Sequence, residues 1–91
     1  MNSLDISNIR FSTTKFREGY SPDEVDSFLE TVRETLQFWE GGRAGGLSAE
    51  SVVSARFTPT KFRTGYDQGQ VDDFLDDVSA TLLSYESGKL P

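Results

Sequence analysis

The chain carries one eleven-residue pattern twice, as Arg10-Phe11-Ser12-Thr13-Thr14-Lys15-Phe16-Arg17-Glu18-Gly19-Tyr20 and as Arg56-Phe57-Thr58-Pro59-Thr60-Lys61-Phe62-Arg63-Thr64-Gly65-Tyr66. The second copy begins forty-six residues after the first, and a helical pattern follows each copy. An ungapped comparison of residues 10–40 with residues 56–86 gives sixteen identities in thirty-one positions. Such density in a short chain indicates a tandem duplication, and the rest of the sequence is interpreted from it.

Each copy is too short to form a stable core alone, because chains below about 40 residues usually need a metal, a disulfide or a partner. The sequence has no Cys and no His, which excludes disulfides and the commonest zinc sites. We therefore expect the copies to bury their apolar faces on each other, on a second chain, or on both. The expected organisation is a first repeat over residues 1–40, a Gly-rich linker over 41–47 and a second repeat over 48–91.

Two long helices are predicted, over residues 22–40 and 69–86. Apolar residues recur in both at three- and four-residue steps, which is typical of a helix packed on one face. They are Val25, Phe28, Leu29, Val32, Leu36 and Trp39 in the first, and Val71, Phe74, Leu75, Val78, Leu82 and Tyr85 in the second. Trp39 and Tyr85 occupy equivalent places at the helix ends, where we expect them to close the core. Short helical turns are expected in residues 4–9 and 48–55.

Helix starts are marked by polar residues. Ser21 with Glu24, and Asp67 with Gln70, have the spacing of a capping box, and Ser48 can cap the short helix after the linker. These signals, with the helical stripes, predict an all-α fold. Two tandem loop-plus-helix repeats would pack as a small helical bundle or pseudo-dimer, with little or no strand and no long coiled coil. The linker is long enough for parallel or antiparallel packing of the repeats, so both alternatives stay open.

The motif loops have their own backbone signals. Gly19 and Gly65 precede a tyrosine, where we expect each glycine to adopt a positive φ. Pro59 lacks a backbone N–H and therefore argues against a central strand in the second loop.

Charge is distributed unevenly, although the net charge of −6 argues against a nucleic-acid partner. Six of the nine basic residues lie in the two motif loops, and the helices that follow are acidic. A solvated helical face is the expected role of Asp72, Asp73, Asp76 and Asp77, whose spacing lacks the tight loop of calcium sites. No arrangement of residues suggests catalysis, so we expect no enzyme activity, no cofactor and no metal. Without an apolar segment or signal-peptide pattern, a cytoplasmic location is expected.

The motif resembles the N-terminal domain of the DivIVA/GpsB family of bacterial cell-division and polar-growth scaffolds. The shared order is Phe, then Phe-Arg, then Gly-Tyr, then Val-Asp-x-Phe-Leu-x-x-Val, and it is present in both copies. The spelling from Phe16 to Leu29 looks most like the actinobacterial form. The resemblance implies a dimer with crossed loops ahead of a parallel helix pair. Family scaffolds continue into a long coiled coil and usually carry one copy, whereas this chain has two copies and no coiled coil.

The resemblance also implies site residues. In DivIVA-like members a loop Phe with an adjacent Arg engages the membrane, which corresponds to Phe16 with Arg17 and Phe62 with Arg63. In GpsB-like members the aromatic after Gly and the Asp after Val form a groove for an Arg-containing peptide of a cell-wall synthase. The corresponding residues are Tyr20 with Asp26 and Tyr66 with Asp72.

Structural roles compete with these functional ones. Phe11 and Phe57 are expected to fold inward, whereas Phe16 and Phe62 could either join the core or contact a membrane. Asp26 and Asp72 could pair with the Arg of their own loop and hold that loop to its helix.

The sequence therefore predicts a non-enzymatic interaction module of bacterial cell division or envelope growth that binds a basic peptide of a protein partner. A peripheral module at the inner face of an anionic membrane, and a purely structural dimerisation module, are the alternatives. A homo-oligomer is possible in each case.

Overall fold

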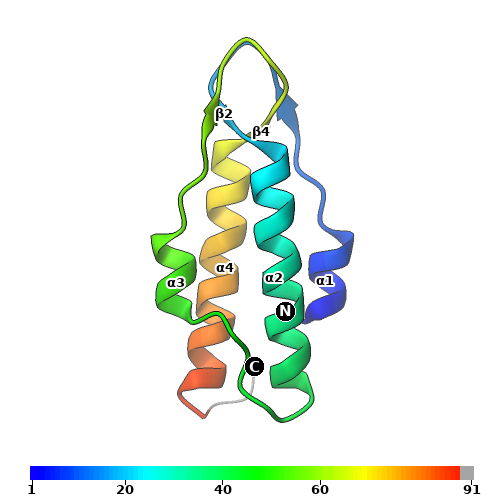
Figure 1. The fold of residues 1–91 in the computed structure, drawn as a ribbon, viewed down its shortest axis with the longest axis vertical. Helices are drawn as coiled ribbons and strands as arrows, with labels where there is room; N and C mark the ends of the chain where they lie inside the picture. Colours follow the sequence, from blue (N-terminus) through cyan, green and yellow to red (C-terminus); the bar gives the residue numbers. More distant parts are fainter. Residues whose placement is uncertain (89–91) are drawn as a thin grey trace.

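The computed structural model describes residues 1–88 and contains four helices and four short strands (Figure 1). In chain order they are α1 (Ser3–Asn8), β1 (Thr13–Thr14), β2 (Gly19–Tyr20), α2 (Pro22–Glu40), α3 (Ala49–Ser54), β3 (Pro59–Thr60), β4 (Gly65–Asp67) and α4 (Gln68–Glu86). Both long helices therefore lie where the apolar periodicity predicts them, and each repeat contributes one short and one long helix.

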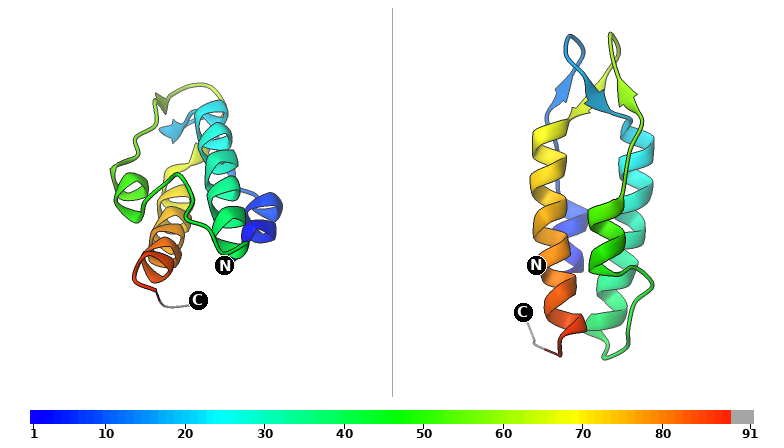
Figure 2. Two further views of the ribbon diagram at one scale, coloured as in Figure 1. Left: turned by 60° about the horizontal axis from the view of Figure 1, so that its bottom comes forward. Right: turned by 90° about the vertical axis from the view of Figure 1, so that its left-hand side faces the viewer.

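The long helices α2 and α4 lie side by side and run in the same direction (Figure 1). Helix α1 packs on the outside of α2, and α3 packs equivalently on α4. The repeats are thus parallel and related by a pseudo-two-fold axis along the long dimension of the molecule, whose principal extents are 43 × 22 × 17 Å. Of the two arrangements left open by the linker, the structure adopts the parallel one. Both motif loops consequently project from the same end (Figure 2).

The core lies between the four helices and uses the predicted stripes. Its buried members are Ile6, Val25, Leu29, Val32, Leu36, Ala49, Val52, Val71, Leu75, Val78 and Leu82. At the end remote from the motif loops, Trp39 and Tyr85 stack with ring centroids 5.4 Å apart and close the core as predicted. Fully burying one such aliphatic side chain contributes about 1.5–3 kcal/mol, so this shared core, rather than either repeat alone, supplies most of the stability.

The expectation of an all-α fold is wrong. The four strands form one antiparallel sheet in the order β1-β4-β2-β3, so the structure is mixed α and β. No strand pairs with a strand of its own repeat: β1 pairs with β4, β3 pairs with β2, and the central pair is β2 with β4. Strands of two or three residues exist here only because the other repeat supplies their hydrogen-bond partners. Pro59 lies in β3 at the edge of the sheet, where its missing N–H costs no ladder bond.

The two glycines of the motif lie where the loops cross. A Cβ atom on Gly19 would lie 2.8 Å from the carbonyl oxygen of Tyr66 and 3.0 Å from the carbonyl carbon of Gly65. Their expected positive φ is wrong, because within residues 1–88 the glycines with positive φ are Gly42 and Gly88. Glycine is required at this crossing because two backbones approach too closely for a side chain.

Helix starts also depend on the other repeat. Asp67 caps α4 as predicted by accepting from the Gln70 N–H at 2.9 Å, whereas Ser21 makes no side-chain cap. Glu24, expected to complete a capping box, instead accepts from the Thr58 N–H at 2.9 Å. The side-chain oxygen of Gln70 likewise accepts a hydrogen bond from the Ser12 N–H, at 2.8 Å. The third residue of each long helix thus anchors the loop of the opposite repeat.

The short helices are anchored at their first residues. Ser48 caps α3 as predicted, by accepting from the Ser51 N–H at 3.1 Å. The last residue of each long helix also reaches the start of the neighbouring short helix: Glu40 accepts from the Ser3 N–H at 2.7 Å, and Glu86 accepts from the Ala49 N–H at 2.8 Å. Among the described residues, no helix has the length and apolarity needed to cross a bilayer.

Replacing Gly19 with Ala is expected to destabilise the fold by about 1–3 kcal/mol, the usual cost of overpacking a close contact. The added methyl group would meet backbone atoms of Tyr66 and Gly65, which no rotamer change can move. Urea denaturation followed by circular dichroism measures the loss.

The matched control is Gly46→Ala, since nothing lies within 4 Å of a Cβ atom at Gly46. Equal stability of the two variants would show that the loops do not cross as described.

Candidate functional site

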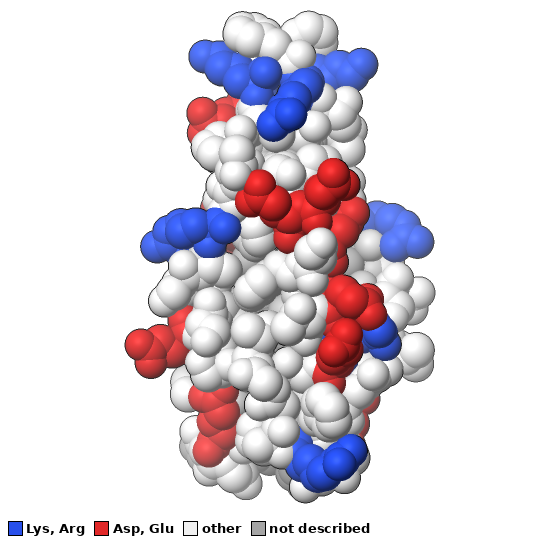
Figure 3. All heavy atoms as spheres, viewed as in Figure 1, with Lys and Arg blue, Asp and Glu red and all other residues white. Residues whose placement is uncertain are grey.

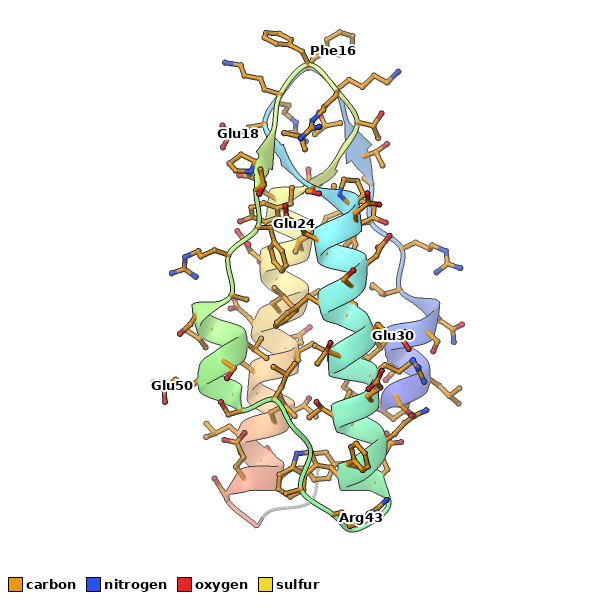
Figure 4. The ribbon with its side chains drawn as sticks, in the orientation of Figure 1. Phe16, Glu18, Glu24, Glu30, Arg43 and Glu50 are labelled. Atoms are coloured by element: carbon orange, nitrogen blue, oxygen red, sulfur yellow. The ribbon has the colours of Figure 1, made fainter. Side chains whose placement is uncertain are left out.

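The ends of the two motif loops, residues 15–18 and 61–64, lie together at one extremity of the molecule and are called the tip. Phe16 is 88% exposed and Phe62 is 79% exposed. Phe16 projects outward beyond the sheet (Figure 4), and the loop that carries Phe62 lies beside it (Figure 2). Both phenylalanines are therefore directed to the solvent, and neither joins the core.

Cations surround the exposed phenylalanines. Lys15, Arg17, Lys61 and Arg63 all lie in the tip, which contains one acidic residue, Glu18, and basic side chains gather at this end of the molecule (Figure 3). Arg17 pairs with Asp67 of the opposite repeat at 2.7 Å, but its side chain remains 74% exposed. The tip thus combines apolar and basic groups on one small surface, although the whole chain is acidic.

Phe62 has a strained backbone, with a φ of 63°. This left-handed region is rare for a bulky residue and typically costs about 1 kcal/mol or more. The Lys61 ammonium lies over the Phe62 ring, 5.5 Å from its centroid. The second loop therefore presents Phe62 to solvent with a backbone conformation that is unfavourable for a bulky residue.

The other motif phenylalanines face inward, as predicted. Phe11 contacts Tyr66 and Phe74, with ring centroids 5.3 and 5.8 Å apart. Phe57 makes the equivalent contacts with Tyr20 and Phe28, at 5.4 and 5.7 Å. Each loop therefore packs one aromatic against the long helix of the opposite repeat and presents the next one to solvent.

Two lateral grooves flank the long helices at pseudo-equivalent positions. The α1–α2 groove encloses about 470 Å³, and its polar lining includes Arg10, Asp26, Glu30, Arg33 and Tyr66. The α3–α4 groove encloses about 350 Å³, and its corresponding residues are Tyr20, Arg56, Asp72 and Asp76. Each groove lies between a short and a long helix of one repeat and is closed by a tyrosine of the other. The short helices were predicted, but their contribution to a groove was not.

The tyrosines and aspartates pair across the repeats. Tyr20 donates to Asp72 and Tyr66 donates to Asp26, each at 2.8 Å. The groupings implied by the resemblance, Tyr20 with Asp26 and Tyr66 with Asp72, are therefore exchanged. The alternative that each Asp pairs with the Arg of its own loop is wrong. The signal in the sequence is the duplication itself. If the two repeats cross as the subunits of a dimer do, each tyrosine meets the long helix of the opposite repeat.

Partial burial, and next the hydrogen bond to Asp72, raise the pKa of Tyr20 above the ordinary value of 10.0. Tyr66 has a raised pKa for the same reasons, with Asp26 as its acceptor. In both cases a phenolate would face a carboxylate. The groove tyrosines therefore remain neutral donors over the whole physiological range.

An arginine stands at the rim of each groove. The Arg10 guanidinium donates to the carbonyl of Ile9 at 2.8 Å, and that of Arg56 donates to the carbonyls of Ala55 and Val53 at 2.8 and 3.1 Å. These bonds satisfy carbonyls at the ends of the short helices, where cations are favourable. Sequence reasoning placed both arginines in the basic loops but did not associate them with a groove.

The acidic residues of α4 show no metal arrangement. Asp72 and Asp76 line the α3–α4 groove, whereas Asp73 and Asp77 are exposed on the helix surface. Within the described part of the chain, no three Asp, Glu, His or Cys side chains are placed to hold a metal ion together.

Comparison with known proteins does not assign the chain to a family: no family model matches it, and neither the curated proteins nor the solved structures give a significant match. The candidate sites therefore rest on the geometry above.

The two tyrosine–aspartate pairs should make stability fall at high pH. Folding raises both tyrosine pKa values, so the neutral phenols stabilise the fold below about pH 10, and this contribution is lost as pH rises through the folded-state values. The double variant Tyr20→Phe, Tyr66→Phe should show a smaller fall in the free energy of unfolding between pH 9 and 11 than the unmodified chain. Each single variant should remove about half of the difference. Parallel pH profiles for all four proteins would contradict the assignment.

Proposed function

We propose that the chain is a non-enzymatic, peripheral membrane-binding module whose tip attaches to an anionic lipid surface. One observation carries the proposal: Phe16 and Phe62 are both exposed at the same end, among the cations of the two loops. Amphipathic surfaces of this kind bind at the boundary of headgroups and acyl chains.

The magnitudes favour use of both loops together. Burying the two phenylalanines would contribute about 3–6 kcal/mol, and the three tip cations without an ion pair in residues 1–88 about 3 kcal/mol. Association costs at least ~4 kcal/mol, which leaves reversible binding near millimolar lipid. One loop alone would barely offset the cost of association. Parallel helices, which place both loops on one end, are what make such attachment feasible.

The biological setting we propose is bacterial cell division or envelope growth, at the inner face of the cell membrane. This proposal rests on the resemblance of both motifs to DivIVA-type domains. A single chain with crossed loops ahead of parallel helices supports it, since the resemblance implies that arrangement for a dimer. A duplicated domain would thus replace two subunits, and oligomerisation through a long coiled coil is not part of the proposal.

The double variant Phe16→Ala, Phe62→Ala should bind anionic vesicles at least about a hundred-fold more weakly than the unmodified chain. Each single variant should lose at least about ten-fold, because burial of one Phe contributes about 1.5–3 kcal/mol and roughly 1.4 kcal/mol corresponds to ten-fold. Flotation with phosphatidylglycerol vesicles at several millimolar lipid measures the bound fraction.

Phe38→Ala provides the matched control, because Phe38 is 43% exposed but lies near the C-terminal end of α2. That variant should float like the unmodified chain. Undiminished flotation of the double tip variant, or no flotation of any protein, would refute the membrane proposal.

A second candidate function is binding of a basic, Arg-containing peptide of a protein partner in the lateral grooves. The observation that favours it is the carboxylate that each long helix presents beside a neutral tyrosine, above an apolar floor. A guanidinium paired with a carboxylate contributes about 1.5–3 kcal/mol, and its fork geometry suits two oxygens. Membrane attachment and peptide binding would use different surfaces, so the two functions are compatible.

Removal of the groove carboxylates should weaken peptide binding. In a titration of the ¹⁵N-labelled chain with the capped peptide acetyl-Leu-Arg-Gly-Arg-amide, we expect saturable amide shifts that weaken at least ten-fold in Asp26→Asn, Asp72→Asn. The version with citrulline in place of both arginines should cause no shifts. Identical titrations for both peptides would show that the charge is not recognised.

A further inference from the structure

The two grooves differ in charge at one pair of equivalent positions. Glu30 of α2 corresponds to Asp76 of α4, so the acidic residue is kept in both repeats. Three residues later, Arg33 of α2 corresponds to Ser79 of α4. Helix α4 contains no Lys or Arg anywhere between Gln68 and Glu86. Any cation bound beside the carboxylates of α4 must therefore come from outside that helix.

The α1–α2 groove already holds a guanidinium. Arg33 lines it and pairs with Glu30 through two hydrogen bonds, one of them from Nε to Oε2 at 3.2 Å. Glu30 projects from α2 on the side of α1 (Figure 4). The side chain of Arg33 is only 26% exposed, so it occupies groove space instead of extending into solvent.

The α3–α4 groove has two carboxylates on α4 but no residue equivalent to Arg33. Asp72 and Asp76 both line it, one helical turn apart. The Ser79 hydroxyl donates to the backbone carbonyl of Asp76 at 2.9 Å and leaves that carboxylate free. Arg56 at the rim is engaged by the carbonyls at the end of α3.

We propose that the α3–α4 groove is the one that receives an arginine-bearing segment of a partner protein, and that Arg33 fills the equivalent place in the α1–α2 groove. This inference rests on the second candidate function. The position of Arg33 beside Glu30 serves as an internal model of the bound state, because an incoming guanidinium would meet Asp76 as Arg33 meets Glu30. Asp72 offers a second carboxylate nearby, through the oxygen that does not accept from Tyr20.

Charge complementarity identifies the occupant. Two carboxylates one turn apart match a guanidinium better than an ammonium, because the planar fork can pair with both oxygens of a carboxylate. The floor contributed by Val52, Phe57 and Leu75 suits an apolar side chain next to the arginine. The chain should therefore bind one such segment, in contrast to the two expected from a symmetric dimer.

Two variants, Arg33→Ser and Ser79→Arg, test this inference by giving each groove the residue of the other. The probe is again acetyl-Leu-Arg-Gly-Arg-amide, with ¹⁵N-labelled protein and amide shifts as the measurement. In the unmodified chain, shifts should be confined to the segments that line the α3–α4 groove, namely α3, residues 55–57, α4 and Tyr20 of β2, with one peptide bound. Arg33→Ser should add a second set of shifts on α1 and α2 and a second bound peptide. Ser79→Arg should weaken binding at the α3–α4 groove at least ten-fold.

Ala80→Arg is the matched control for Ser79→Arg, since it adds the same charge at an exposed neighbouring position outside the groove. It should change affinity less than three-fold. Equal shifts around both grooves in the unmodified chain, or unaltered stoichiometry in Arg33→Ser, would overturn the assignment while leaving peptide binding intact. Absence of shifts from every variant would overturn peptide binding itself, and this inference with it.

Discussion

The structure depends on the close crossing of two backbones at Gly19 and Gly65. Because no side chain separates them, each motif loop continues past the other and pairs with strands of the opposite repeat. The same exchange brings Glu24 to the backbone of Thr58 and Gln70 to that of Ser12. Helix packing alone could hold α2 and α4 together in several ways. The crossing selects the parallel one, and thereby places both exposed phenylalanines on one end.

Local periodicity was sufficient to predict the helices, because their apolar stripes and caps are properties of single segments. The strands could not be predicted in this way, since each has two or three residues and no partner within its own repeat. The tyrosine–aspartate pairs were assigned to the wrong partners for the same reason: Tyr20 and Asp72 are fifty-two residues apart in sequence. Gly19 was correctly recognised as special, but close approach rather than positive φ explains it. Duplication was visible in the sequence, whereas the exchange between copies was not.

The candidate surfaces illustrate how a net charge can mislead. A chain with a net charge of −6 nevertheless presents a basic, phenylalanine-bearing tip, because four of its nine basic residues lie there with a single acidic residue. The sequence does not decide whether Phe16 and Phe62 join the core or face solvent. Their exposure follows from the crossed loops, which extend beyond any described helix that could cover them. The groove tyrosines, in contrast, are covered, since each is hydrogen-bonded to the long helix of the other repeat.

The parallel helix pair has a consequence for any encounter of the tip with a charged surface. A helix of nineteen residues is about 28 Å long at 1.5 Å per residue. Electrostatic interactions in physiological salt decay over a Debye length of about 8 Å. If the tip rests on an anionic surface with the long axis upright, Glu34, Glu40 and Glu86, in the far halves of α2 and α4, stand at least two screening lengths away. Their charge is screened from that surface and is available to whatever approaches from the side.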